Sequence, residues 1–335
     1  MTEPPVRITT VEMHTGGEPV RIIVGGYPAL RGATLLDKRR DARERLDRWR
    51  RFLMAEPRGH ADMYGALLVE PDLPDADLAV LFLHNEGYST MCGHAVIALG
   101  RYATDRGLVA RGEPCTKVAV QCPCGLVEAR VETATGGVRF TSVPAFALHR
   151  DAVVLTDRFG PVTLDAAYGG AFYAILPAAE LGLDIERSPL AAITAAAMEV
   201  KAAAMAQLAF AHPDAAELAY LYGVILTDGH DGRGETPTTN VCVFADGQVD
   251  RSPTGSGVTA RMALMHRRGQ VATDEPRRFR SVTGAVFTAR VAESVRAGPH
   301  PAVLVEVGGR AHYTGEAVFT LEADDPLGEG FLLRR

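Results

Sequence analysis

The chain has 335 residues, of which 47% are apolar and 23% are charged, and its formal net charge is −6. This length accommodates two domains of ordinary size, and the composition is that of a soluble globular protein. The modest negative net charge gives no sign of a basic surface for nucleic acid or an anionic membrane. No run of the sequence reaches the roughly 18 apolar residues of a membrane span. We therefore expect a cytoplasmic protein that acts on small molecules, with neither nucleic acid nor membrane as a partner.

The first half of the chain predicts short strands around one apolar helix. We expect two strands between Arg7 and Ile23, joined by a glycine-containing turn, and then an amphipathic helix with a mixed-charge face. The predicted helices cover residues 38–51 and 92–104, the predicted strands cover residues 64–70, 78–83, 117–120, 126–131 and 137–141, and Pro144 begins an expected junction.

The second half repeats this order. Strands are predicted at 163–168, 171–176, 221–227, 239–245, 278–283, 285–291, 302–307 and 311–320, with helices at 190–210 and after Thr254. Small polar residues precede a helix in both halves, Cys92 and Gly93 in the first and Thr254 and Gly255 in the second, which indicates a divergent internal duplication. We expect an α+β fold of two similar domains, residues 1–150 and 151–319, each a curved sheet on a central helix. Residues 320–335 are expected to return to the first domain.

The five cysteines (92, 115, 122, 124 and 242) form neither a disulfide framework nor a zinc motif of the usual spacing. Four of them lie in or beside strand-like runs and are interpreted as packing residues. The pairs His60/Asp62 and His230/Asp231 also lack a recognisable ligand spacing, so no metal is predicted.

Cys92 is the exception, because it stands at the start of an apolar helix, after the N-cap types Ser89 and Thr90. The free N–H groups of a helix end favour anions, so they can lower the pKa of a thiol and hold a substrate carboxylate. A buried structural cysteine is the alternative interpretation of this pattern.

Two helix ends that face one cleft would make a strong carboxylate site, for which an amino acid is a natural ligand. Asp250 could accept from the ligand's ammonium group, and His94 could make a second contact or set the ionisation of Cys92. A Cys92 thiolate could then remove the Cα proton, provided that the carboxylate is held by donors that bind better as charge develops on it.

The residue that matches Cys92 in the second half is Thr254, whose hydroxyl is too weak an acid to serve as a general base at neutral pH. Such a one-sided site suits elimination better than racemisation: Cys92 takes the α proton and a β leaving group departs, with Thr254 a candidate donor to that group. No cofactor is needed for this chemistry.

Five segments of the chain, the two helix-end motifs among them, resemble the proline racemase family, whose fold is diaminopimelate-epimerase-like. The matching segments are residues 13–19, 56–60, 85–94, 250–257 and 281–287. The resemblance implies that Cys92 is the catalytic acid/base, and that the substrate-binding positions are Gly93, His94, Asp250, Gly255 and Ser256. Proline racemases and 4-hydroxyproline 2-epimerases carry a second cysteine where this chain has Thr254. Members with threonine there resemble trans-3-hydroxy-L-proline dehydratases, which eliminate water and give 1-pyrroline-2-carboxylate.

Two alternative functions remain. The chain could racemise or epimerise proline or 4-hydroxyproline, or it could bind an amino acid without catalysis. The run Gly255-Ser256-Gly257 is like part of a phosphate-binding loop, but no Lys-Ser/Thr pair follows it, which argues against a nucleotide site. The oligomeric state stays open, a homodimer being the commonest assembly.

Overall fold

The computed structural model describes residues 6–234 and 236–333. The helices are α1 (Leu35–Arg45), α2 (Asp47–Met54), α3 (Gly93–Asp105), α4 (Leu190–Gln207) and α5 (Gly255–Arg267). The strands are β1 (Val6–Thr15), β2 (Glu18–Gly25), β3 (Tyr64–Val69), β4 (Leu78–His84), β5 (Tyr88–Ser89), β6 (Cys115–Cys122), β7 (Gly125–Glu132), β8 (Val138–Thr141), β9 (Phe146–Thr156), β10 (Gly160–Tyr168), β11 (Phe172–Pro177), β12 (Leu221–Thr227), β13 (Thr238–Phe244), β14 (Gln248–Asp250), β15 (Arg277–Arg280), β16 (Val286–Ala297), β17 (His300–Gly309) and β18 (Ala311–Leu321). None of the helices in these two ranges is long and apolar enough to cross a bilayer.

Helix α3 is the core of the first half. The sheet curves around it, and strands β1, β2, β6, β7, β8 and β18 all contact it. Every side chain from Ala95 to Leu99 is fully buried, so this part of the helix has no exposed face; Arg101 and Asp105 reach solvent only near its end. A helix that is apolar all round must be enclosed, and the curved sheet encloses it.

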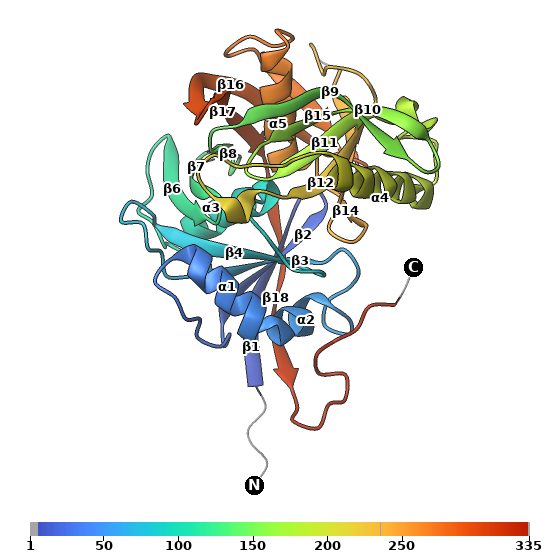
Figure 1. Ribbon diagram of the computed structural model, residues 1–335. Coiled ribbons are helices and arrows are strands. Elements are labelled where there is room, and N and C mark those ends of the chain that lie inside the picture. Colours follow the sequence, from blue (N-terminus) through green and yellow to red (C-terminus); the bar gives the residue numbers. More distant parts are fainter. Residues whose placement is uncertain (1–5, 235, 334–335) are drawn as a thin grey trace.

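Helix α5 has the same place in the second half, where β9, β10, β11, β16 and β17 contact it (Figure 1). Residues 255–265 of α5 are all buried. The two curved sheets are joined where β17 pairs with β8, with Val307 opposite Phe140. The expected α+β fold, with two similar units built on central helices, is confirmed.

Strand β18 belongs to the first half's sheet although it comes late in the chain. It runs antiparallel to β1, with Val6 opposite Leu321 and Thr15 opposite Ala311, and the two lie side by side in Figure 1. The chain after β18 then lies against the segment that follows α2, where Arg58 binds Asp325 at 2.5 Å. The domain boundaries given above stay a prediction.

Two expectations about local structure are wrong. The helix predicted over residues 38–51 is two helices, because Leu46 leaves the helical conformation and buries its side chain with Trp49 and Leu53. The junction predicted after Pro144 is mostly strand β9, whose pairing with β10 outweighs its local turn signals. Those signals mark an irregularity instead: Asp151 has a φ of 53°, and the β9–β10 register shifts beside it.

Candidate active site

The N-terminal ends of α3 and α5 meet at a pair of glycines. A Cβ built on Gly93 would lie 2.6 Å from the Cα of Gly255, and a Cβ on Gly255 would lie 2.7 Å from the Cα of Gly93. No side chain fits at either position. The first N–H groups of a helix have no partner within the helix, so this contact brings two sets of donors and two positive dipole ends to one place.

A small buried pocket lies at this junction. All seven residues selected from the sequence line it: Cys92, Gly93, His94, Asp250, Thr254, Gly255 and Ser256. The remaining lining residues are Tyr64, Met91, Tyr173, Tyr222, Cys242 and Phe244. The structure thus brings the two predicted motifs together across the two halves, while the role of each residue stays a prediction.

Cys92 is the N-cap residue of α3 and is only 5% exposed. The two expected cap residues have other partners: Thr90 donates to the Gly170 carbonyl at 2.8 Å, and Ser89 bonds the Tyr64 hydroxyl. The Cys92 sulfur lies 3.0 Å from Nδ1 of His94. The helix end therefore presents a thiol–imidazole pair.

Burial raises the pKa of the Cys92 thiol well above its usual range, and the nearby carboxyls of Asp250 and Glu18 raise it further. The backbone N–H of Ala95 donates to the sulfur and opposes this rise. The lowered thiol pKa that the helix end suggested is therefore wrong, because desolvation outweighs the helix end. Burial likewise lowers the pKa of His94 to about 3, so the pair is neutral near pH 7.

Thr254 is the N-cap residue of α5 and has a φ of 64°. A β-branched residue in the left-handed region is strained, and such strain clusters at functional sites. Its buried Oγ1 makes no hydrogen bond of ordinary geometry within the described part of the chain. It is still close enough to Asp250 and to the Cys242 thiol to lower their pKa values. This hydroxyl is free to bond a ligand in the pocket.

Asp250 ends β14 and accepts a hydrogen bond from the Ser252 backbone N–H at 2.7 Å. Burial raises the pKa of its carboxyl to about 6, against the opposing effect of the bonds from Ser252. Asp250 is therefore charged near neutral pH and can accept from a cationic group.

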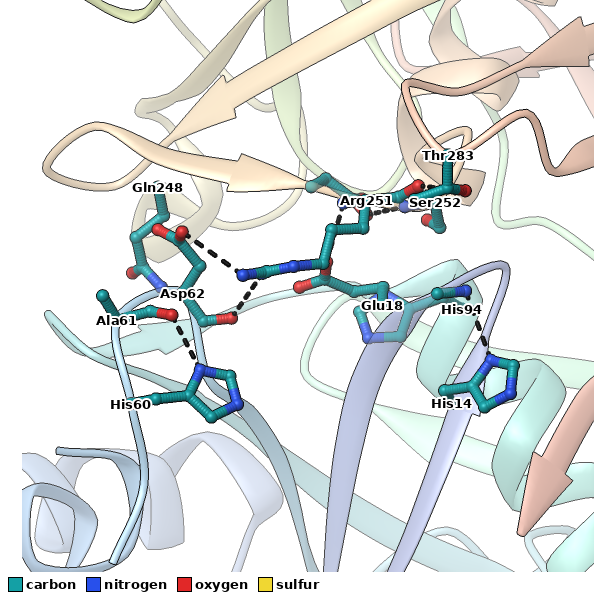
Figure 2. Close-up of polar contacts among 12 residues, drawn as sticks. His14, Glu18, His60, Ala61, Asp62, His94, Gln248, Arg251, Ser252 and Thr283 are labelled. Atoms are coloured by element: carbon teal, nitrogen blue, oxygen red, sulfur yellow. Dashed lines mark hydrogen bonds and ion pairs between the residues drawn. The ribbon is translucent and has the colours of Figure 1, made fainter. Parts of the chain in front are cut away.

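Arg251 ties the Asp250 loop to the first half. Figure 2 shows its side chain between Asp62 and Glu18, and the guanidinium lies 3.5 Å and 3.6 Å from their carboxylates. The Arg251 backbone N–H also donates to Oε2 of Glu18 at 2.7 Å. Burial and the charge of Asp250 raise the pKa of Glu18 well above its usual range. Glu18 thus links the first turn of the chain to the loop that carries Asp250.

The sequence did not point to the aromatic wall of the pocket. The rings of Tyr222 and Phe244 stack with centroids 5.3 Å apart, and the ring of Tyr64 meets His94 edge-on at 4.9 Å. These residues lie in or beside strands whose pattern reads as ordinary core, so no local signal identifies them. Cys242, interpreted as a packing residue, also faces this pocket and is fully buried.

The described residues contain no cluster of three or more histidine, cysteine or acidic side chains that could hold a metal ion.

The family model for proline racemase matches residues 10–332. The chain is 55% identical to trans-L-3-hydroxyproline dehydratase of Bos taurus, over 98% of this chain and 95% of the relative. It is 44% identical to trans-3-hydroxy-L-proline dehydratase of Colwellia psychrerythraea, over 98% of this chain and 93% of that relative. A solved hydroxyproline epimerase from Agrobacterium vitis, with bound trans-4-hydroxy-L-proline, superposes with a TM-score of 0.91 at 29% identity, covering 98% of this chain and 95% of that one. A phenazine biosynthesis protein of the PhzF family from Bacillus anthracis shares the fold, with a TM-score of 0.57 at 12% identity. The match covers 93% of this chain and 99% of that one.

Proposed function

Because the chain belongs to the proline racemase family, we propose that it dehydrates trans-3-hydroxy-L-proline to 1-pyrroline-2-carboxylate. The observation that carries the proposal is the unequal pair at the two facing helix ends. A thiol, Cys92, caps α3, and a hydroxyl, Thr254, caps α5. The dehydratases of Bos taurus and Colwellia psychrerythraea, which are 55% and 44% identical to this chain, support the same reaction.

The facing helix ends are suited to the substrate carboxylate. Backbone N–H groups at Gly93, Gly255 and Ser256 would donate to its oxygens, and these donors bind more strongly as negative charge moves onto the carboxylate. Asp250 would accept from the ring ammonium. The substrate's Cα is then held at the pocket between Cys92 and Thr254.

The reaction begins with removal of the Cα proton by Cys92 in its thiolate form. The C3–O bond then breaks, water leaves, and the enamine product tautomerises to 1-pyrroline-2-carboxylate. Thr254 cannot return a proton to the other face of Cα as an acid/base thiol would, since a hydroxyl is too weak an acid. Elimination is the outcome that such a one-sided site favours. A cytoplasmic location and a homodimer remain expectations from the sequence.

A product assay tests this proposal. The purified protein is incubated separately with trans-3-hydroxy-L-proline, trans-4-hydroxy-L-proline and L-proline, and pyrroline formation and optical rotation are followed. We expect pyrroline from the 3-hydroxy compound and no inversion of the other two. Inversion without loss of water would instead identify a racemase or epimerase, and tight binding without turnover would identify a binding protein.

The variant Thr254→Cys should gain epimerase behaviour, because it places a second thiol on the opposite face of Cα. We expect it to convert trans-4-hydroxy-L-proline to its 2-epimer in deuterated water, with deuterium at Cα, at a rate at least tenfold above that of the wild type. The matched variant Thr254→Ser keeps a hydroxyl and should not gain this activity. Equal epimer formation by both variants would contradict the proposed role of position 254.

The pH dependence should report the ionisation of Asp250, whose pKa is about 6. Only the charged carboxylate attracts the substrate ammonium, and the charged fraction falls as the pH drops below this value. We expect kcat/KM to fall about tenfold per pH unit below pH 6. Asp250→Asn should lower kcat/KM about 10- to 100-fold at pH 7.5 and remove this acid limb. An unchanged acid limb in the variant would assign it to another group.

A further inference from the structure

The shape of the substrate decides on which side the hydroxyl leaves. In trans-3-hydroxy-L-proline the C3 hydroxyl and the carboxylate lie on opposite faces of the ring. The hydrogen on Cα also lies opposite the carboxylate, so this hydrogen and the hydroxyl share one face. The base that removes the hydrogen therefore stands on the face from which the hydroxyl departs. If Cys92 is that base, the hydroxyl leaves on the Cys92 side of the pocket and not on the Thr254 side.

The Cys92 side of the pocket holds a group, the His94 imidazole, that can both accept a proton from the thiol and donate one to a leaving group. His94 is 2% exposed, and its Nδ1 lies 3.0 Å from the Cys92 sulfur. Cys92 and His94 line the same pocket, so the His94 ring would face a bound substrate from the same side as the Cys92 sulfur. The Tyr64 hydroxyl is close by, but it is already bonded to Ser89, and burial raises its pKa.

We propose that His94 is a catalytic residue that protonates the departing hydroxyl on the face of the ring occupied by Cys92. This inference rests on the proposed dehydration. It gives the leaving group a donor on the α3 side, and it leaves Thr254 to line the face that bears the carboxylate.

The proton balance of this step closes within the pair. The Cys92 thiol proton moves to Nδ1 of His94, which leaves a thiolate beside an imidazolium. The thiolate forms an S–H bond with the Cα hydrogen, and the electrons of the C–H bond form the C2–C3 double bond. The C3–O bond breaks with its electrons on oxygen, and the Nδ1 proton bonds to that oxygen to give water. Cys92 then carries a thiol and His94 is neutral, as before the reaction.

The surroundings of the pair favour this return to neutrality. The titratable groups that act on the Cys92 thiol include Asp250 on β14, Tyr64 on β3 and Glu18 on β2, and none of these is a cation. Tyr173 on β11, Tyr222 on β12 and Cys122 on β6 also interact with it, and they too carry no positive charge. Burial disfavours both an isolated thiolate and an isolated imidazolium. A charged pair 3.0 Å apart can form only as a transient state, which the chemical step consumes.

A comparison of two leaving groups tests the proposal. Fluoride leaves without being protonated, whereas hydroxide needs an acid. We assay His94→Asn with trans-3-hydroxy-L-proline and trans-3-fluoro-L-proline from pH 6 to 10. In His94→Asn, we expect the rate of water elimination from trans-3-hydroxy-L-proline to be about 10²- to 10⁴-fold below the wild-type rate at every pH. Fluoride release should recover toward the wild-type rate as the pH rises, because the thiol then ionises without a partner.

The control His149→Asn changes a half-buried histidine of β9 that does not line the pocket, and it should leave both rates unchanged. Its ring bonds the Ala209 carbonyl at 2.8 Å and meets the Phe210 ring edge-on. An equal loss of both activities in His94→Asn at every pH would overturn the proposal.

If His94→Asn fails to fold, a second test assays the wild-type enzyme with cis-3-hydroxy-L-proline, whose hydroxyl lies on the same ring face as the carboxylate. We expect it to be dehydrated at least 100-fold more slowly than the trans compound, and equal rates would overturn the proposal. Failure of the proposed function is a separate result, namely no pyrroline from the trans compound with the wild type.

Discussion

The variant Cys92→Ala is expected to lose dehydration of trans-3-hydroxy-L-proline by about 10³-fold or more, with little change in thermal stability. The pocket holds no other thiol at a helix end, and a residue that removes the proton in the first step cannot be bypassed. A sulfur replaced by hydrogen leaves a small gap, whose cost for stability is modest. The measurement is pyrroline release under saturating substrate, together with a thermal melt.

The matched control is Cys115→Ala, which changes a half-buried cysteine at the start of β6, away from the pocket residues. It should keep wild-type turnover. Retained turnover in Cys92→Ala, or equal losses in the two variants, would remove Cys92 from the mechanism.

The variant Gly93→Ala is expected to lower kcat/KM by about 10²-fold and the free energy of unfolding by about 1–3 kcal/mol. Its new methyl group would lie 2.6 Å from the Cα of Gly255 and 3.0 Å from the Gly255 carbonyl carbon. The nearest obstacle is backbone of the other half, with the Phe140 ring also 3.0 Å away, so the two helix ends must separate. This separation would move the backbone N–H donors of the two helix ends apart, which weakens binding of the substrate carboxylate.

Gly315→Ala serves as the control, because nothing lies within 4 Å of a Cβ at that position. It should change neither kcat/KM nor the melting temperature. A fully active Gly93→Ala protein would show that the reaction does not require the close contact of α3 and α5.

The sequence predicted the two central helices and the residues at their ends because these signals are local. Apolar residues all round a helix, and small residues before it, can be recognised without knowing the rest of the fold. The duplication then predicted that Cys92 and Thr254 would lie in corresponding places, and the structure puts both in one pocket. The order of residues along the chain was sufficient for this part of the site.

The aromatic wall and the pKa values could not be predicted in the same way. Tyr222 and Phe244 belong to the pocket because β12 and β13 carry them to it in the folded chain, and the sequences of these strands have the pattern of ordinary core. The pKa of Cys92 depends on how completely the two halves enclose it, which no local pattern encodes. The break at Leu46 was missed for a similar reason, since it follows from the packing of that side chain.

The pairing of β1 with β18 has a consequence for how the protein is made. Residues 6–15 find one neighbour in β2 almost at once, but their other neighbour, residues 311–321, is synthesised about three hundred residues later. Domains usually fold in order as they leave the ribosome, at about 5–20 residues per second. Here the sheet around α3 stays open along one edge of β1 until nearly the whole chain exists. The half of the chain that is synthesised second can therefore assemble before the sheet of the first half is complete.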